Sequence, residues 1–367
     1  MAPTSDSRPP SASLSRVSTQ ARSSEPALHD ISISVARGEV LALLGVGGAL
    51  SGTATVMQLF AGFARPSGGQ VHLSGRLMDA TPPHRRGIGV VTRRLVLFPH
   101  LDPLGHARFA PGVTEAQAER MLQHLGLQAF SRRRWQVLSP ELQFRVALAR
   151  ALAPAPRVLL LEDPFPALPH AAAAALKSLL RSFAAEADVS IILTTDEADS
   201  CYGLADRIGV MQSGALRQIG PPQELYEHPA TLAVAQALGP LNRIAGSVVD
   251  IEDDIAAIRL TSGALVEARF VGELQAGDAC IVTLRPERIA VAAINIGEMG
   301  EGAVPAHLVD ATFTGHVQTL RFSLDAKRGN APAVIVTRPS GIALPSNPEM
   351  CLAWQPHHAR AFRAETA

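Results

Sequence analysis

Residues 41–63 read LALLGVGGALSGTATVMQLFAGF. An apolar run typical of a buried strand leads into a glycine-rich turn, and apolar residues at helical spacing follow the turn. Gly47 and Gly52 are separated by four residues, which is the glycine spacing of a phosphate-binding loop. The segment therefore predicts a strand, a loop and a helix, with backbone N–H groups that form an anion nest at the N-terminus of the helix.

The side chains of this loop depart from that pattern. A phosphate-binding loop continues with lysine and then serine or threonine, whereas Thr53 and Ala54 stand here, with Thr55 one residue further on. No change of register recovers a lysine, because Lys177 and Lys327 are the only lysines of the chain. Two interpretations stay open: a nucleotide site without its usual cation, or a glycine-rich turn that binds no phosphate tightly.

The composition narrows the class of protein. The chain has 367 residues, of which 47% are hydrophobic, so it can form two or more domains with sizeable cores. The formal net charge is zero, which gives no electrostatic reason to expect nucleic-acid binding. The 3 cysteines are widely spaced, which argues against a disulfide framework or a zinc site. The sequence has no apolar stretch of membrane-spanning length.

The pattern along the chain predicts two domains after a disordered, Ser/Pro-rich tail at residues 1–26. Residues 27–236 alternate apolar strands with helical segments, as in an α/β domain with a mostly parallel sheet and a helix-rich insert at about 95–155. RVLLLED and VSIILTT are further buried strands of that sheet. Residues 242–360 contain strand-like runs separated by turns, which predicts a small all-β barrel of OB-like type.

Together these segments resemble the ATP-binding subunit of an ABC importer, of the subfamily that serves polyamine, iron(III), sulfate or sugar uptake. The resemblance covers nearly the whole chain from about residue 28. Its segments include LHDISISVARGEVLALLG, RVALARALAPAPRVLLLEDP, ADRIGVMQSGALRQIGPPQELYEHPA and LRPERIAV. It implies an α/β P-loop NTPase-type ABC cassette followed by a regulatory β-barrel domain.

The resemblance also implies cofactors, partners and a location. The cofactors are ATP and Mg²⁺. The partners are a second cassette, in a homodimer or heterodimer, and membrane permease subunits, with a solute-binding protein acting indirectly. The implied location is cytoplasmic, peripheral on the inner face of the cell membrane. The nucleotide-binding positions of the family fall on Gly47, Gly48, Gly52, Thr53, Ala54, Thr55 and Ser139.

Four further positions of the family carry the hydrolytic chemistry. Glu162 holds the magnesium-side position and Asp163 the general-base position, so both carboxylates are kept with their lengths exchanged; the alternative is a pair of acids solvated at the end of a strand. Thr195 stands at the histidine that senses the γ-phosphate. Arg93 stands at the glutamine that contacts magnesium and the attacking water, and arginine cannot ligate a cation because it has only donors. Arg93 could instead place positive charge near a phosphate, or be a solvated loop residue.

The segment LSPEL, residues 138–142, stands where the family has LSGGQ. Pro140 lacks an N–H and Glu141 brings negative charge, so the segment opposes a phosphate. It is better suited to start a helix, with Ser139 as N-cap and Pro140 as the first helical residue. Pro169 replaces the aspartate of the family's next loop, and no aromatic residue precedes Phe60 to stack on an adenine.

These departures predict weak or absent ATP hydrolysis in any dimer. Each ATP site is shared between two cassettes, and this chain would contribute either the altered Thr53 loop or the altered LSPEL segment to it. The predicted function is an ATP-binding-cassette subunit of a solute importer that couples nucleotide binding to a membrane permease. The alternative is a non-hydrolysing pseudo-ATPase that acts as a structural or regulatory partner of a transporter. A nucleic-acid-associated cassette is disfavoured by the zero net charge and the transport-type C-terminal domain.

Overall fold

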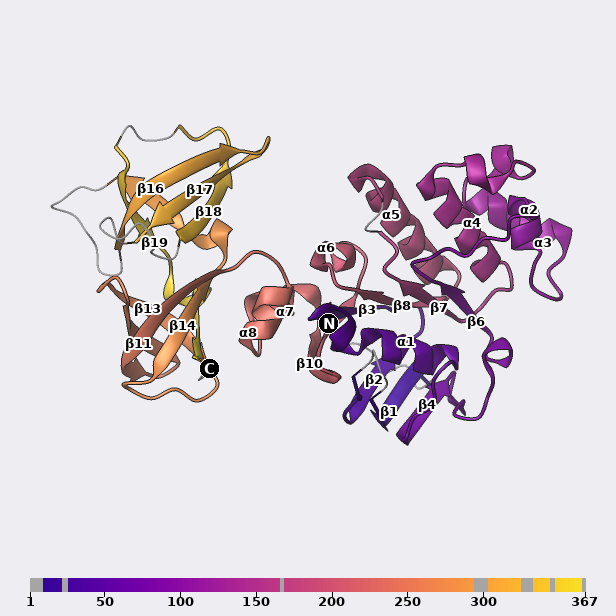
Figure 1. Ribbon diagram of the computed structural model, residues 1–367, viewed down its shortest axis with the longest axis horizontal. Helices are drawn as coiled ribbons and strands as arrows, with labels where there is room; N and C mark the ends of the chain where they lie inside the picture. The colour runs from indigo at the N-terminus through magenta and orange to yellow at the C-terminus, as the bar shows by residue number, and fades with distance from the viewer. Residues whose placement is uncertain are drawn as a thin grey trace. The chain divides into compact units, whose positions relative to one another are not determined.

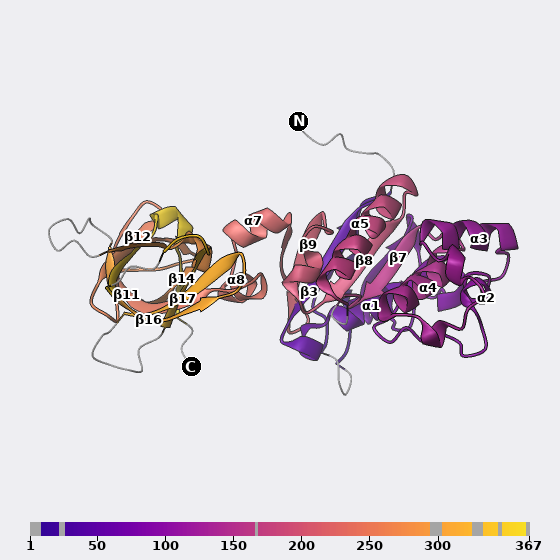
Figure 2. The ribbon, with the colours of Figure 1, turned by 90° about the horizontal axis from the view of Figure 1, so that it is seen from above.

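The computed structural model describes residues 9–21, 26–165, 168–293, 303–324, 333–343 and 347–364. The chain divides into two units, Met1–Tyr226 and Glu227–Ala367, and each is described by itself (Figures 1 and 2). The sequence pattern predicts the change of domain later, between residues 236 and 242. Two short helices precede that point, α7 (Pro222–Glu227) and α8 (Leu232–Ala237). None of the helices in the described ranges is long and apolar enough to cross a membrane.

A six-stranded sheet with the order β10-β9-β3-β8-β7-β6 forms the centre of the first unit. Its strands are β3 (Val40–Val46), β6 (Ile88–Val91), β7 (Val158–Glu162), β8 (Ser190–Thr195), β9 (Arg207–Gln212) and β10 (Ala215–Gly220). All neighbours pair in parallel except β10, which runs antiparallel to β9 at the edge. The prediction of a mostly parallel α/β sheet is confirmed.

A second sheet of the first unit has the order β2-β1-β4-β5. Its strands are β1 (Ala12–Ser18), β2 (Ile31–Val35), β4 (Gly68–Leu73) and β5 (Arg76–Leu77). The predicted disordered tail at residues 1–26 is wrong for β1, which pairs with β2 and β4. The reason is burial, since Ala12, Leu14 and Val17 enter the core within a Ser-rich stretch. Residues 1–8 and 22–25 of that tail lie outside the described residues.

Helices cover both faces of the central sheet (Figure 1). Helix α1 (Thr53–Ala61) lies between the two sheets, where Val56, Leu59 and Phe60 share one core with residues of both. Helix α5 (His170–Glu186) covers the opposite face with Leu176, Leu180 and Ala184 buried. Helix α6 (Ala198–Cys201) follows β8. The sheet is therefore buried on both sides, as a parallel sheet requires.

A buried arginine fixes the C-terminal end of α1. Arg86 is 6% exposed, and its Nη1 donates to the carbonyl oxygens of Leu59 at 2.6 Å and Phe60 at 3.0 Å. The helix ends at Gly62, where φ is 85°. A Cβ at this position would lie 2.5 Å from Arg86 Nε. The missing side chain of Gly62 thus makes room for a cation at the negative end of the helix dipole.

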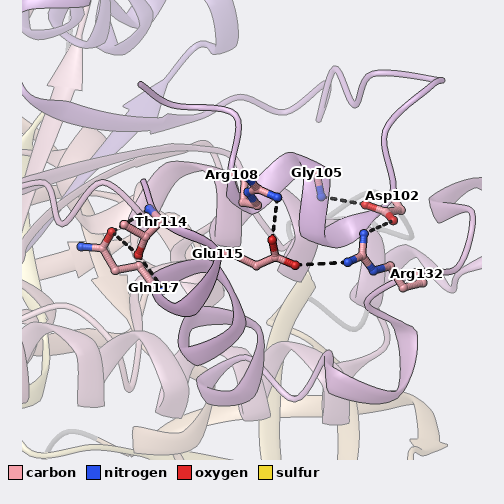
Figure 3. A network of polar contacts seen from close by, with 7 residues as sticks. All are labelled: Asp102, Gly105, Arg108, Thr114, Glu115, Gln117 and Arg132. Carbon is pink, nitrogen blue, oxygen red and sulfur yellow. Dashed lines mark hydrogen bonds and ion pairs between the residues drawn. The ribbon is translucent and has the colours of Figure 1, made fainter. Parts of the chain in front are cut away.

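The helix-rich insert contains α2 (Pro103–Ala107), α3 (Glu115–His124) and α4 (Pro140–Leu152). Thr114 is the N-cap of α3, and Gln117 completes a capping box with it. Glu115 accepts from Arg108 at 2.9 Å and from Arg132 at 3.3 Å, and Figure 3 shows how this carboxylate joins the two arginines at the start of α3. These contacts tie α2 to α3 at the surface of the insert.

A buried histidine holds the segment that leads from β6 into the insert. His106 has no exposed surface, and its Nε2 accepts from the Phe98 N–H at 2.8 Å. Its Nδ1 lies 2.9 Å from the Asp102 carbonyl oxygen, so the ring is neutral with the proton on Nδ1. Burial lowers the pKa of His106, and the nearby Arg150 lowers it further. Arg150 also donates to the Leu95 carbonyl oxygen at 3.1 Å.

The described strands of the second unit form two β-sheets, one of them a closed barrel with the order β11-β12-β13-β20-β14. The barrel strands are β11 (Asn242–Glu252), β12 (Ile255–Leu260), β13 (Leu265–Val271), β14 (Ala279–Leu284) and β20 (Arg360–Arg363). The other sheet, β15-β19-β16-β17-β18, contains β15 (Ala290–Ala293), β16 (Val304–Phe313), β17 (Val317–Ser323), β18 (Ala333–Pro339) and β19 (Glu349–Ala353). The predicted all-β barrel is confirmed, and the sheet beside it shares its core.

We predict that the unfolding free energy falls on acidification because of His106. Its folded-state pKa lies below the ordinary 6.5, so the unfolded chain binds the additional proton. The stability that neutral, buried His106 contributes is complete above pH 6.5 and decreases as the pH falls below that value. His106→Gln keeps an acceptor for the Phe98 N–H without titrating. In urea unfolding from about pH 7.5 to about pH 5.5, wild type should lose more free energy than His106→Gln. Equal losses would contradict the prediction.

Candidate functional site

Four positions singled out in the sequence meet at the carboxyl edge of the parallel sheet. β3, β8, β7 and β6 run in the same direction, so their C-terminal ends lie at one edge, where ligands of open α/β sheets bind. The glycine loop follows β3, and Arg93 lies just beyond β6. Glu162 is the last residue of β7, and Thr195 is the last residue of β8.

The loop between β3 and α1 depends on glycines with left-handed backbone. The φ angles are 86° at Gly47, 63° at Gly48 and 93° at Gly52. A short 3-10 turn spans Gly48–Ser51, and α1 begins at Thr53. Glycine adopts this backbone at little cost. The glycine spacing therefore has a structural reason that holds with or without a phosphate.

The side chain at the lysine position is turned into the loop. Thr53 is 8% exposed, and its Oγ1 lies 3.1 Å from Ser51 Oγ. The Thr53 N–H donates to the same Ser51 oxygen at 3.4 Å. A Cβ on Gly45 would lie 2.6 Å from both Ser51 Oγ and Asp196 Oδ1, so these two side chains pack against the start of the loop. The loop thus satisfies part of its own polar groups and presents no cation at Thr53.

A pocket of about 280 Å³ lies beside the first turn of α1. Ala54 and Thr55 belong to this turn, and Thr55 is 4% exposed. The lining residues are Thr19, Gln20, Ala21, Thr55, Ala64, Arg65, Pro66 and Ser67. None of these described residues carries an aromatic ring. A base in this pocket would lack the roughly 1–3 kcal/mol that stacking on such a ring provides.

Asp163 is the centre of the polar contacts at this edge. It has a φ of 44°, and its N–H donates to the Thr194 carbonyl oxygen at 2.8 Å. Thr195 Oγ1 donates to Asp163 Oδ1 at 3.1 Å, and Arg93 Nη1 lies 3.4 Å from Asp163 Oδ2. Both carboxylate oxygens therefore have a partner. The structure brings Arg93, Asp163 and Thr195 together, while their catalytic roles stay predictions.

Two further carboxylates lie at the same edge. Glu162 Oε2 accepts from the Arg93 backbone N–H at 3.3 Å. Asp196 was not among the residues singled out in the sequence, although TTDEAD places an acid directly after the strand. The pKa of Asp196 is raised by desolvation and by the charge of Asp163, and Arg93 lowers it. Asp163 and Asp196 thus lie in the field of the Arg93 guanidinium, while Glu162 contacts the backbone N–H of Arg93.

The LSPEL segment starts a helix, as predicted. Ser139 Oγ accepts from the Leu142 N–H at 3.4 Å, and Pro140 is the first residue of α4. Glu141 Oε1 accepts from Arg145 Nη2 at 2.6 Å, so its charge is paired one turn along the helix. The polar groups of this segment therefore serve the structure of α4.

The start of α4 also borders a pocket of about 250 Å³. Its lining residues are Thr92, Arg93, Leu95, Pro140, Gln143, Phe144, Asp163, Pro164 and Leu168. Arg93 and Asp163, at the edge of the sheet, thus line the same pocket as residues of α4 in the insert. Pro169 precedes α5 without a side-chain hydrogen bond at the helix start, and His170 is exposed as the first helical residue. His170 is therefore a surface residue.

Comparisons with known proteins agree with this architecture. Residues 28–166 match a family described as ABC transporter. The spermidine/putrescine import ATP-binding protein PotA of Rubrobacter xylanophilus is 34% identical over 298 residues, which cover 79% of this chain and 77% of the relative. PotA 1 of Pseudomonas aeruginosa is 33% identical over 301 residues, covering 79% and 80% of the two chains.

Two solved structures share the fold. A nucleotide-free ATP-binding cassette from an ABC transporter has a TM-score of 0.56 at 17% identity, and the match covers 63% of this chain and 99% of that one. The dimeric bacterial ABC transporter cassette MJ0796 has a TM-score of 0.51 at 22% identity, with coverages of 57% and 98%. At these identities the likeness concerns the fold alone.

We predict that the Thr195 hydroxyl stabilises the sheet edge. Thr195→Val removes the donor to Asp163 and the acceptor that receives the Glu197 N–H at 3.1 Å. The neighbouring Thr194 is the matched control, because it is equally buried and its Oγ1 lies 4.0 Å from Met57 Sδ. In urea unfolding, Thr195→Val should lose about 1–2 kcal/mol more than Thr194→Val. The same loss in both variants would contradict this assignment.

Proposed function

The chain belongs to the ABC transporter family, and we propose that it is the ATP-binding-cassette subunit of a solute importer with weak or absent ATP hydrolysis. In this proposal it couples nucleotide binding to membrane permease subunits from the cytoplasm, as a peripheral protein on the inner face of the cell membrane. The cassette pairs with a second cassette, and a solute-binding protein acts indirectly. The similarity to spermidine/putrescine import proteins supports polyamines as the solute class.

The observation that carries the proposal of low activity is the buried Thr53 at the lysine position. Phosphoryl transfer depends on neutralising the charge that spreads over the phosphate oxygens. A threonine hydroxyl bonded within its own loop cannot supply that charge. Asp163 adds to the effect, because its side chain is one methylene shorter than the glutamate that the family has at the general-base position, and base catalysis depends on reach.

The residues present fit a polyphosphate better than a metal ion. The positive-φ glycines ahead of α1 leave a backbone nest that can accept an anion. Mg²⁺ requires oxygen ligands, and Ala54 offers none at the family's hydroxyl position. Glu162 keeps a carboxylate at the magnesium-side position, although this carboxylate accepts from the Arg93 N–H. The residues at this position therefore fit a magnesium ion poorly.

A second candidate function is a non-hydrolysing pseudo-ATPase that serves as a structural or regulatory partner of a transporter. The contacts of the LSPEL segment favour it, since Ser139 caps α4 and Glu141 pairs with Arg145. A competent partner cassette would not restore hydrolysis. One shared site would contain the Thr53 loop, and the other would contain the start of α4.

We predict that restoring the loop side chains strengthens nucleotide binding without restoring turnover. In the full-length chain, Thr53→Lys combined with Ala54→Ser should raise ATP affinity at least about tenfold in calorimetry with Mg²⁺. The reason is the added charge and metal-binding hydroxyl at the phosphates. Steady-state hydrolysis should stay low, because the LSPEL segment is unchanged. Leu50→Lys is the matched control. Leu50 is 63% exposed in the same loop, so a lysine there adds the same charge at a position other than the family's lysine position.

The proposal of low activity would be contradicted by tight, magnesium-dependent ATP binding of the wild-type chain together with turnover that Asp163→Asn abolishes. The prediction for the loop would be contradicted by an equal gain of affinity in the double variant and in Leu50→Lys, because only net charge would then matter. ATP binding without turnover would favour the importer subunit over a chain that binds no nucleotide.

A further inference from the structure

The ion pair between Arg93 and Asp163 is long and exposed at the arginine, so the guanidinium can leave the carboxylate for another anion. Arg93 Nη1 lies 3.4 Å from Asp163 Oδ2, which is longer than the 2.7–2.9 Å typical of a charge-assisted hydrogen bond. The Arg93 side chain is 71% exposed, whereas that of Asp163 is 17% exposed. The Arg145–Glu141 pair at 2.6 Å, with side-chain exposures of 19% and 29%, is the contrasting tight pair. Because its arginine is exposed to solvent, the Arg93–Asp163 pair is screened at one end and should contribute less to stability than the Arg145–Glu141 pair.

The backbone holds this exposed guanidinium at the same edge of the sheet from which the glycine loop leaves. The Arg93 N–H donates to Glu162 Oε2 at 3.3 Å, which fixes the start of the side chain at the sheet edge. Its partner Asp163 accepts from Thr195, at the end of the strand adjacent to β3. Asp196, the next residue, packs against Gly45 at the start of the loop. A short series of contacts therefore runs from Arg93 to the loop.

We propose that Arg93 is a phosphate-binding residue that exchanges the Asp163 carboxylate for the terminal phosphate of a bound nucleoside triphosphate. Without nucleotide, the guanidinium neutralises Asp163 and occupies one of its oxygens. With nucleotide, the phosphate takes the guanidinium, and this oxygen of Asp163 is released. The inference rests on the proposed function, because it needs a nucleotide in the loop before α1.

The charges favour this exchange. A terminal phosphate carries more negative charge than one carboxylate and offers several acceptor oxygens to the planar guanidinium fork. The loop itself supplies no cation at Thr53, so the charge of the phosphate is not already compensated there. Asp163 and Asp196 repel each other at the same edge, and this repulsion favours a cation nearby. Arg93 can provide that cation while it remains within reach of a phosphate.

The test compares ATP with ADP, because only ATP has the terminal phosphate. Binding of each nucleotide to the full-length chain is measured by calorimetry for wild type, Arg93→Gln and Arg94→Gln. Arg94 is the matched control, being an exposed arginine one residue further on. Arg93→Gln should weaken ATP binding about tenfold and change ADP binding less than about twofold. Arg94→Gln should change neither, and thermal unfolding verifies that all variants fold.

A double-mutant cycle separates phosphate binding from a purely structural ion pair. Asp163→Asn should raise ATP affinity by about threefold or more when Arg93 is present, and by less in the Arg93→Gln background. A structural pair would alter unfolding and leave the ratio of ATP to ADP affinity unchanged. If wild type binds ATP and Arg93→Gln keeps the same ratio, the inference fails while the proposed function stands. If wild type binds neither nucleotide, both fail.

Discussion

Parallel pairing of β3, β8, β7 and β6 is the constraint on which the candidate site depends. It brings the ends of four strands, far apart in the sequence, to a single edge. Asp163 contacts both Thr195 and Arg93 only because their strands end together. The strands themselves are held by apolar residues on both faces, between α1 and α5. The arrangement of the polar groups is thus a by-product of hydrophobic packing.

Because packing and chemistry use different side chains, one can change while the other persists. The glycines of the loop are required by its left-handed backbone, and Gly45 by the close approach of Ser51 and Asp196. Neither requirement involves a lysine. At the start of α4, Ser139 and Pro140 form a helix start that serves stability alone. The cassette fold can therefore persist in a chain whose phosphate-facing side chains differ from the family pattern.

The sequence was informative where periodicity and capping act locally. The central strands, the N-caps at Thr114 and Ser139, and the all-β character of the second unit follow from such patterns. β1 was missed because its Ser-rich composition suggests disorder, while alternate residues are buried against α1 and its neighbours. β20 extends past residue 360, where the predicted β domain ends; its four residues carry almost no signal, and only barrel closure between β13 and β14 gives them a partner. Contacts such as Arg93 with Asp163 depend on tertiary placement, which no local pattern encodes.

The cap that Arg86 places on α1 has a consequence for the opposite end of the same helix. The arginine compensates the negative pole of the helix macrodipole at Leu59 and Phe60. The positive pole, about half an elementary charge, lies at the glycine loop and needs no side chain to exist. A field of this kind attracts any small anion and distinguishes poorly between sulfate, inorganic phosphate and a nucleotide. With no aromatic platform and no lysine to add discrimination, anion selectivity would have to come from residues outside the loop.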